Sequence, residues 1–234
     1  MSGSRHRQSR AVSRPSPVSS CFMARLVAIE GLDGAGKNTI TRALTAEFAA
    51  RGATVGSLAF PRYGRSIHAD LAAEALHGAH GDTASSVYSM GLLFALDRAD
   101  ARDEIGVLLG GHDVVLLDRY AASSAAYSAA RLGEGADGGA AAWVADLEFG
   151  RFRLPVPDLQ VYLEVPAAVA ASRTRSREAA DASRARDAYE RDGDLQERTG
   201  AVYRGLAASG WVSPWYVHAD GDSPAELAEA IAAS

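Results

Sequence analysis

A glycine-rich turn between an apolar run and a helical pattern constrains the fold of this chain more than any other feature. Residues 26–29 predict a buried strand and residues 39–50 predict a helix. The intervening glycines allow backbone N–H groups to approach anionic oxygens without a Cβ in the way, and the helix N-terminus adds partial positive charge. Lys37 then offers a mobile cation at the same point. The stretch therefore predicts a site for phosphate groups.

Gly31, Gly36 and Lys37 have the spacing of the P-loop motif G-x-x-x-x-G-K-[ST], in the required strand–loop–helix context. Asn38 departs from the motif, because Ser or Thr at this position offers a hydroxyl to Mg²⁺; Thr39 follows it. The alternative is a glycine-rich turn with a chance lysine. Lys37 is, however, the only lysine among 24 lysine and arginine residues, which favours the motif. The predicted ATP-binding residues of the loop are Gly31, Asp33, Gly34, Ala35, Gly36, Lys37, Asn38 and Thr39.

Length and charge limit the class of protein. A chain of 234 residues suits one α/β domain, expected over residues 24–234. The net charge is −5, and the first 24 residues carry arginines but no acid, so the remainder is more acidic still. An acidic body argues against general nucleic-acid binding, which needs a broad basic face. No apolar run approaches the roughly 18 residues of a membrane span.

Cys21 is the only cysteine, so an intramolecular disulfide is impossible and a reducing, cytoplasmic setting is expected. Residues 1–23 are rich in Ser, Arg and Pro and predict a disordered basic tail without a catalytic role. Two alternatives stay open for this segment. It can be an organelle transit peptide, or Met23 can be the working initiator.

Strand-like runs alternate with helical patterns, which predicts βαβ units. The expected fold class is α/β: a three-layer P-loop NTPase-type fold with a five-stranded parallel sheet flanked by helices, plus a helical arginine-rich lid. The predicted strands cover residues 26–29, 54–60, 114–117, 159–165 and 215–218. The predicted helices cover residues 37–51, 66–77, 84–109, 121–131, 140–150, 167–179, 187–209 and 224–232.

Two further motifs directly follow predicted strands. Phe60-Pro61-Arg62-Tyr63 follows the second strand, and Asp118-Arg119-Tyr120 follows the third. Right-handed crossovers place the ends of these strands at the edge of the sheet that carries the glycine-rich loop. Asp118 can hold Mg²⁺ there and Arg119 can bind a phosphate, although a solvent-facing pair is the plainer interpretation of these two residues.

Helical residues after these motifs offer groups that can recognise a base. Phe94 and Arg98 are one turn apart and share a helix face, so a ring and a guanidinium can contact one base; core packing is the default role for such an aromatic residue. Ser123, Ser124 and Tyr127 follow at a helix start, where hydroxyls contact a sugar or base edge or only cap the helix.

An arginine-rich stretch at about residues 173–187 contains Arg173, Arg177 and Arg184. A solvated helix with weak ion pairs explains it in the simplest way. A break at residues 179–183 favours helix–loop–helix, the shape of a lid. Arginines that close over a triphosphate neutralise charge in phosphoryl transfer. Asp187 and Glu190 share a helix face and can approach a metal or a substrate.

Taken together, these motifs resemble the thymidylate kinase family of P-loop nucleoside monophosphate kinases, over residues 25–234. The resemblance implies transfer of the γ-phosphoryl group of ATP to dTMP with Mg²⁺, and a homodimer. It implies that Lys37 and the loop hold ATP together with Arg173, and that Lys37, Arg119, Arg177, Arg184 and Asp33 are catalytic. It further implies that dTMP contacts Asp33, Phe60, Tyr63, Phe94, Arg98, Arg119, Ser123, Ser124 and Tyr127, and that Asp33, Asp187 and Glu190 lie at the metal.

Two positions depart from the family pattern. Some relatives place a basic residue at the position of Asn38, so the lid must supply the corresponding charge here. Ser124 replaces an Asn that contacts the base in some relatives, and its hydroxyl reaches less far. The alternatives to this interpretation are a P-loop kinase of another nucleotide or nucleoside and a non-kinase P-loop NTPase switch.

Overall fold

A computed structural model describes residues 24–180 and 188–234 of the chain. The predicted tail at residues 1–23 lies outside the described residues. So does the central part of the predicted lid, residues 181–187, which includes Arg184 and Asp187.

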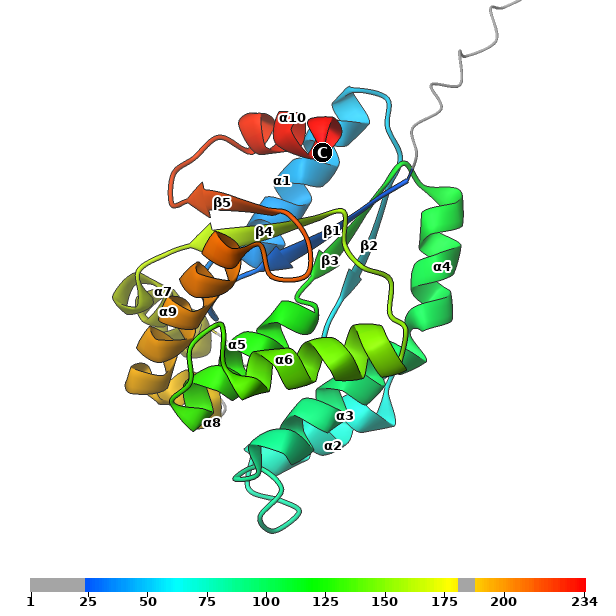
Figure 1. Ribbon diagram of the computed structural model, residues 1–234. Coiled ribbons are helices and arrows are strands. Elements are labelled where there is room, and N and C mark those ends of the chain that lie inside the picture. Colours follow the sequence, from blue (N-terminus) through cyan, green and yellow to red (C-terminus); the bar gives the residue numbers. More distant parts are fainter. Residues whose placement is uncertain (1–23, 181–187) are drawn as a thin grey trace, which may run out of the picture.

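A five-stranded sheet forms the centre of the molecule (Figure 1). All its strand pairs are parallel, and the strand order is β2-β3-β1-β4-β5. The strands are β1 Arg25–Glu30, β2 Val55–Ala59, β3 Val114–Asp118, β4 Leu159–Glu164 and β5 Trp215–Ala219. The predicted α/β class with a five-stranded parallel sheet is confirmed. The prediction succeeded because short apolar runs of strand length are typical of parallel strands buried between helices.

Helices cover both faces of the sheet. Helices α1 and α10 pack together on one face, and α5, α6 and α9 lie on the other (Figure 1). Among the described residues, no helix is both long and apolar enough to cross a membrane. The helices are α1 Lys37–Ala50, α2 Ile67–Leu76, α3 Val87–Asp100, α4 Arg102–Gly111, α5 Ala121–Leu132, α6 Gly139–Ala145, the π-helix η1 Asp146–Arg151, α7 Ala167–Ala180, α8 Ala188–Arg191, α9 Gly193–Ser209 and α10 Pro224–Ala233.

The prediction of one helix over residues 84–109 is wrong, because the chain forms α3 and α4 with a break at Ala101. The backbone carbonyl of Asp97 in the last turn of α3 accepts from Ala101 N at 3.2 Å and also from the guanidinium of Arg62 at 2.8 Å, so a side chain from another element contacts the helix at this break. The predicted helix over 140–150 is divided into α6 and the π-helix η1 that continues it. The predicted helix over 187–209 is divided into α8 and α9, and Asp192 caps α9 by accepting a hydrogen bond from Leu195 N at 2.9 Å.

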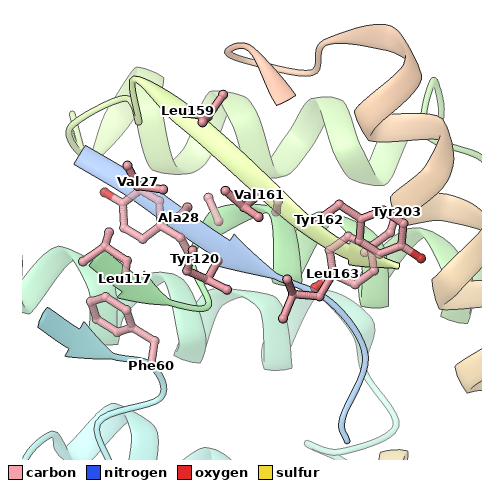
Figure 2. Packing of buried hydrophobic residues seen from close by; sticks show 14 of the residues in the cluster. Val27, Ala28, Phe60, Leu117, Tyr120, Leu159, Val161, Tyr162, Leu163 and Tyr203 are labelled. Atoms are coloured by element: carbon pink, nitrogen blue, oxygen red, sulfur yellow. The ribbon is translucent and has the colours of Figure 1, made fainter. Parts of the chain in front are cut away.

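The core forms around the central strand β1, whose residues 26–30 are all buried. Figure 2 shows the packing on both sides of it. Tyr162 on β4 stacks on Tyr203 of α9, with ring centroids 5.3 Å apart. This stacked pair joins the sheet to the helix layer just beside the end of β1. The apolar layers therefore hold the carboxyl end of β1 rigidly in place, and the glycine-rich loop begins there.

The loop after β2 is attached to α3 by a buried ion pair. Arg62 Nε donates to Asp97 Oδ1 at 2.8 Å, and the backbone N–H of Arg62 donates to Asp97 Oδ2 at 2.9 Å. Asp100 accepts a further bond from the same guanidinium at 2.7 Å. This attachment sets the position of Phe60 and Tyr63 relative to the helix that carries Phe94 and Arg98.

Asp97→Ala is therefore expected to destabilise the fold by about 3–5 kcal/mol, because it leaves the Arg62 guanidinium buried without its main partner. The measurement is the free energy of unfolding from urea denaturation. Asp103→Ala is the matched control, since Asp103 is almost fully exposed and its contact with Arg102 is 3.8 Å long; a change of at most about 0.5 kcal/mol is expected there. Equal losses in the two variants would contradict this role of the buried pair.

Candidate active site

The carboxyl edge of the sheet opens into one cavity of about 850 Å³. It receives residues from the glycine-rich loop, from the ends of β2 and β3, and from α3, α5 and α7. Most of the predicted site residues whose side chains are described line this cavity: Asp33, Gly34, Gly36, Lys37, Asn38, Thr39, Phe60, Tyr63, Phe94, Arg98, Arg119, Ser123, Ser124, Tyr127 and Arg173. Asp118 also lines it.

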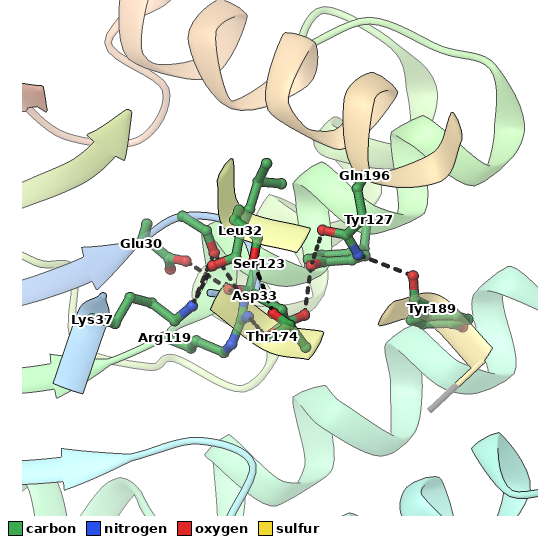
Figure 3. Close-up of polar contacts among 12 residues, drawn as sticks. Glu30, Leu32, Asp33, Lys37, Arg119, Ser123, Tyr127, Thr174, Tyr189 and Gln196 are labelled. Carbon is green, nitrogen blue, oxygen red and sulfur yellow. Dashed lines mark hydrogen bonds and ion pairs between the residues drawn. The ribbon is translucent and has the colours of Figure 1, made fainter. Parts of the chain in front are cut away.

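The glycine-rich loop has the backbone conformation that its composition predicts. Gly31, Gly34 and Gly36 have φ of +146°, +86° and +98°, which residues with a Cβ rarely adopt. The Nζ of Lys37 donates to the carbonyls of Gly31 at 3.1 Å and Leu32 at 2.9 Å (Figure 3). The lysine thus folds back over its own loop and holds its cation at the mouth of the loop.

Burial and the nearby Arg119 lower the pKa of Lys37 to about 8, although the carboxylates of Asp33 and Asp118 act in the opposite direction. An ammonium whose pKa is lowered in this way gains strongly from an incoming anion, because the anion replaces lost hydration. Asn38 and Thr39 follow it with exposed side chains that line the cavity.

Helix α7 packs directly on the glycine-rich loop. A Cβ at Gly34 would lie 2.1 Å from the carbonyl oxygen of Ala170 and 2.7 Å from Oγ1 of Thr174. The absence of a side chain at Gly34 is therefore a packing requirement as well as a conformational one. The first part of the predicted lid thus lies directly against the loop.

Asp33 sits at the centre of a polar network (Figure 3). One carboxylate oxygen forms an ion pair with Arg119 Nη2, and the other accepts a hydrogen bond from the Tyr127 hydroxyl at 2.9 Å. Burial raises the pKa of Asp33, but the positive charges of Arg119 and Lys37 outweigh this and lower it to about 2. Asp33 is therefore ionised throughout the neutral range and fixes Arg119 and Tyr127 on one side of the cavity.

Arg119 adopts a left-handed backbone conformation with φ of +66°, which is strained for a residue with a Cβ. Its Nη1 donates to the carbonyl of Gly31 at 3.3 Å and to Ser123 Oγ at 3.1 Å. The guanidinium thus bridges the glycine-rich loop and α5. The strained turn lies directly after β3, and from there Arg119 lines the cavity.

Glu30 is a residue that sequence reasoning missed. This fully buried carboxylate accepts from Tyr120 N at 2.8 Å through Oε1, and from Ser123 Oγ at 2.6 Å and the Tyr203 hydroxyl at 3.0 Å through Oε2. Burial raises its pKa, while these hydrogen bonds and the charge of Arg119 oppose the change. A charged residue directly after the apolar run 26–29 was the available signal.

The far end of the cavity holds the residues predicted to recognise a base. Phe94 is half-buried there, and Tyr63 is about half exposed. Arg98 is buried and donates to Ser124 Oγ at 2.5 Å. Phe60, by contrast, is buried in the main core and packs against Tyr120. Only a small part of its surface borders the cavity, and any contact with substrate is limited to that part.

Ser123 is likewise more enclosed than its predicted contact with substrate suggests. Its hydroxyl donates to Glu30, accepts from Arg119 and lies 2.9 Å from the Tyr203 hydroxyl. Its polar atom is therefore already used within the protein. The geometry makes Ser123 a support for Arg119.

The remaining predicted residues lie toward α7. Arg173 forms an ion pair with Asp220 at 3.0 Å and borders both the main cavity and a smaller one of about 270 Å³ beside Ala35. Arg177 and Glu190 belong to α7 and α8, but their side chains lie outside the described residues, as do Arg184 and Asp187.

Tyr189 of α8 was also missed from the sequence, and it borders the cavity. Its ring stacks on Tyr127 with centroids 6.0 Å apart, and its hydroxyl accepts a hydrogen bond from Arg131. Arg131 also lies over the ring, 4.8 Å from its centroid. These contacts attach the chain just after the predicted lid to α5.

Gly34→Ala is expected to abolish binding of inorganic tripolyphosphate while most of the secondary structure remains, because its Cβ would force apart the loop and α7. Calorimetric titration gives the affinity, and circular dichroism checks the fold. Gly110→Ala is the control, since a Cβ there meets nothing within 4 Å. Unchanged affinity in Gly34→Ala would contradict the close packing of loop and helix.

Comparison with known proteins agrees with this geometry. The family model described as thymidylate kinase matches residues 29–214. A thymidylate kinase of Mycobacterium tuberculosis strain H37Rv is 59% identical over 207 residues, covering 88% of this chain and 97% of the relative. A thymidylate kinase of Xanthomonas oryzae pv. oryzae is 31% identical over 196 residues, covering 79% and 73%. A cavity lined by a glycine-rich loop with its lysine and by a ring and a guanidinium from α3 thus occurs in a chain that belongs to the thymidylate kinase family.

Proposed function

We propose that this protein transfers the γ-phosphoryl group of ATP to the phosphate of dTMP, giving ADP and dTDP. One observation carries the proposal: the same cavity is lined by Lys37 of the glycine-rich loop, by Phe94 and Arg98 of α3, and by Arg119. A donor and an acceptor nucleotide can therefore lie with their phosphates together. Family membership makes dTMP the acceptor that fits best.

The donor nucleotide is held by the glycine-rich loop. Backbone N–H groups of residues 36–39, at the N-terminus of α1, face its phosphates, and Lys37 exchanges its two carbonyl contacts for phosphate oxygens. The smaller cavity beside Arg173 and Asp220 suits the rest of the nucleotide, because it continues directly from Gly36 and Thr39.

The acceptor nucleotide lies across the rest of the cavity. Arg119 and Tyr63 hold its phosphate, Phe94 stacks on the thymine ring and Arg98 donates to the edge of the base. Tyr127 and Asp33 lie beside the sugar, where their mutual hydrogen bond leaves little room for a 2′-hydroxyl. Each of these assignments rests on the position of the side chain in the cavity.

Phosphoryl transfer of this kind needs positioning and positive charge more than covalent chemistry. Lys37 and Arg119 stand ready at the junction of the two nucleotides before either binds, because Asp33 and the loop carbonyls fix them there. An oxygen of the dTMP phosphate attacks the γ-phosphorus in line, and ADP leaves as the bond to the bridging oxygen breaks.

The described residues fit a Mg²⁺ ion bound mainly by phosphates. They contain no cluster of three or more His, Cys, Asp or Glu side chains that could hold a metal, whereas Mg²⁺ at nucleotides commonly takes one or two protein carboxylates. Asp118 lines the cavity near Lys37 and Asp33 lies beside it, so these two would hold the ion. When bound, Mg²⁺ neutralises phosphate charge. The predicted contributions of Asp187 and Glu190 remain proposals.

A lid over residues 173–187 belongs to the same proposal. Arg173 already borders the donor side, and Arg177 and Arg184 follow along the chain. Such arginines neutralise the transferring group and exclude water, which matters here because Asn38 brings no charge to the loop. We also propose a cytoplasmic homodimer, consistent with a single cysteine and with exposed apolar residues such as Tyr88 and Leu92 on α3.

A coupled ADP-release assay with dTMP, dUMP, UMP, dCMP and dGMP tests the function. The highest kcat/KM is expected with dTMP, and little ADP is expected without an acceptor. Lys37→Ala should lower kcat by about two to three orders of magnitude, whereas Arg42→Ala on the exposed side of α1 should not. Preference for another acceptor, ATP turnover without one, or near-normal rates in Lys37→Ala would refute the assignment.

The pKa of Lys37 predicts a pH-dependent affinity for ATP. In the free protein Lys37 is mostly an ammonium below about pH 8 and mostly a neutral amine above it. Above pH 8 the amine must therefore take up a proton when ATP binds, and this weakens the apparent affinity. The Kd for ATP is expected to rise about tenfold between pH 7 and pH 9. Calorimetric titration at the two values measures it. Lys37→Arg stays charged and should show no such change; equal pH dependence in both proteins would contradict the role of Lys37.

A further inference from the structure

We propose that Glu148 positions Arg98 and thereby makes the cavity select a pyrimidine with an oxygen at C4 over one with an amino group there. The inference rests on the proposed function, because it concerns the base of the acceptor nucleotide. It assigns a role to a residue that does not border the cavity and has no distinctive sequence motif.

Glu148 binds the side edge of the Arg98 guanidinium. Arg98 Nε donates to Glu148 Oε2 at 2.6 Å, and Arg98 Nη2 donates to Oε1 at 2.6 Å. Glu148 has no exposed surface and Arg98 is 3% exposed, so the pair is sheltered from water. A bidentate pair of this kind fixes both the plane and the direction of the guanidinium.

The backbone around Glu148 is fixed as well. Glu148 lies in η1, where Phe152 N donates to the Leu147 carbonyl at 2.9 Å, and its own carbonyl accepts from Leu154 N at 3.0 Å. The carboxylate therefore approaches Arg98 from a firmly held wall behind the cavity. In this arrangement Glu148 acts on the nucleotide only through Arg98.

The pairing leaves the Nη1 edge of the Arg98 guanidinium for the ligand. Within the described residues, Nε and Nη2 have hydrogen-bond partners and Nη1 has none, although Arg98 lines the cavity. Ser124 Oγ accepts from Nη2, so the hydrogen of its hydroxyl remains available as a second donor beside Nη1. The wall of the cavity thus presents hydrogen-bond donors at this point.

Donors at this wall discriminate between pyrimidines. Thymine and uracil carry a carbonyl oxygen at C4, which accepts from Nη1, whereas cytosine carries an amino group that places donor against donor. The charge of Glu148 also matters, because it makes the buried pair neutral and suits the cavity to an uncharged base. A guanidinium without this partner would be free to turn toward the phosphates.

The test is Glu148→Gln, assayed with dTMP and dCMP. The amide keeps the size and one acceptor, but its NH₂ group opposes a guanidinium N–H, so Arg98 must turn. We expect kcat/KM for dTMP to fall roughly ten- to hundredfold, mainly through KM, because the base lies away from the transferred group. The value for dCMP should change much less, so the preference ratio falls.

Asp146→Asn is the matched control. Asp146 lies in the same helical segment and pairs with Arg151 at 2.8 Å, but both side chains are largely exposed; dTMP and dCMP kinetics should both remain as in the wild type. A preference ratio unchanged in Glu148→Gln, with both substrates impaired equally, would show a purely structural role and overturn the proposal. Absence of dTMP turnover in the wild type would instead refute the proposed function.

A measurement on the wild type covers the case in which Glu148→Gln does not fold. If Glu148 fixes Arg98 before the nucleotide arrives, the Nε–H of Arg98 exchanges slowly with solvent in the ligand-free protein, as nitrogen-15 NMR can detect. Fast exchange that becomes slow only after dTMP is added would mean that the nucleotide, and not Glu148, organises Arg98, and would overturn the inference.

Discussion

The hydrogen bonds that Glu30 accepts at the end of the central strand hold the site together. A buried carboxylate is stable only where hydrogen-bond donors replace its lost hydration. Here the donors come from the turn after β3, from α5 and from α9. The same residue immediately precedes the glycine-rich loop, so the positions of the loop and of Arg119 are set by one group. The strained backbone of Arg119 is tolerated because its neighbour, Tyr120, is held in this way.

Three buried or partly buried arginines follow the same principle. Arg62 is paired with Asp97, Arg98 with Glu148, and Arg119 with Asp33. Each guanidinium is held by a carboxylate before any ligand binds, so little reorganisation is needed when charge develops during transfer. Of the three, Arg98 and Arg119 line the cavity, whereas Arg62 holds the loop after β2 against α3.

Much of the sheet and the cavity was predictable from local sequence. Apolar runs indicated all five strands, and motifs directly after strands had to meet at one edge, which is why Lys37, Arg119 and Phe60 were correctly expected to lie together. The break between α3 and α4 was not indicated by the local sequence, and Arg62 from another element contacts α3 at that point. Glu148 and Tyr189 were missed for a similar reason: only folding brings them to α3 and α5.

The sequence by itself determined the parallel sheet, the glycine-rich loop before α1 and the family, since these depend on periodicity and on residue spacing within short segments. Only the tertiary structure decided which charges pair. The partners of Arg98 and Glu30 lie 50 and up to 173 positions away along the chain, and no local pattern specifies contacts at such separations. They arise because the packing of helices against the sheet buries these groups together and leaves each with one set of partners.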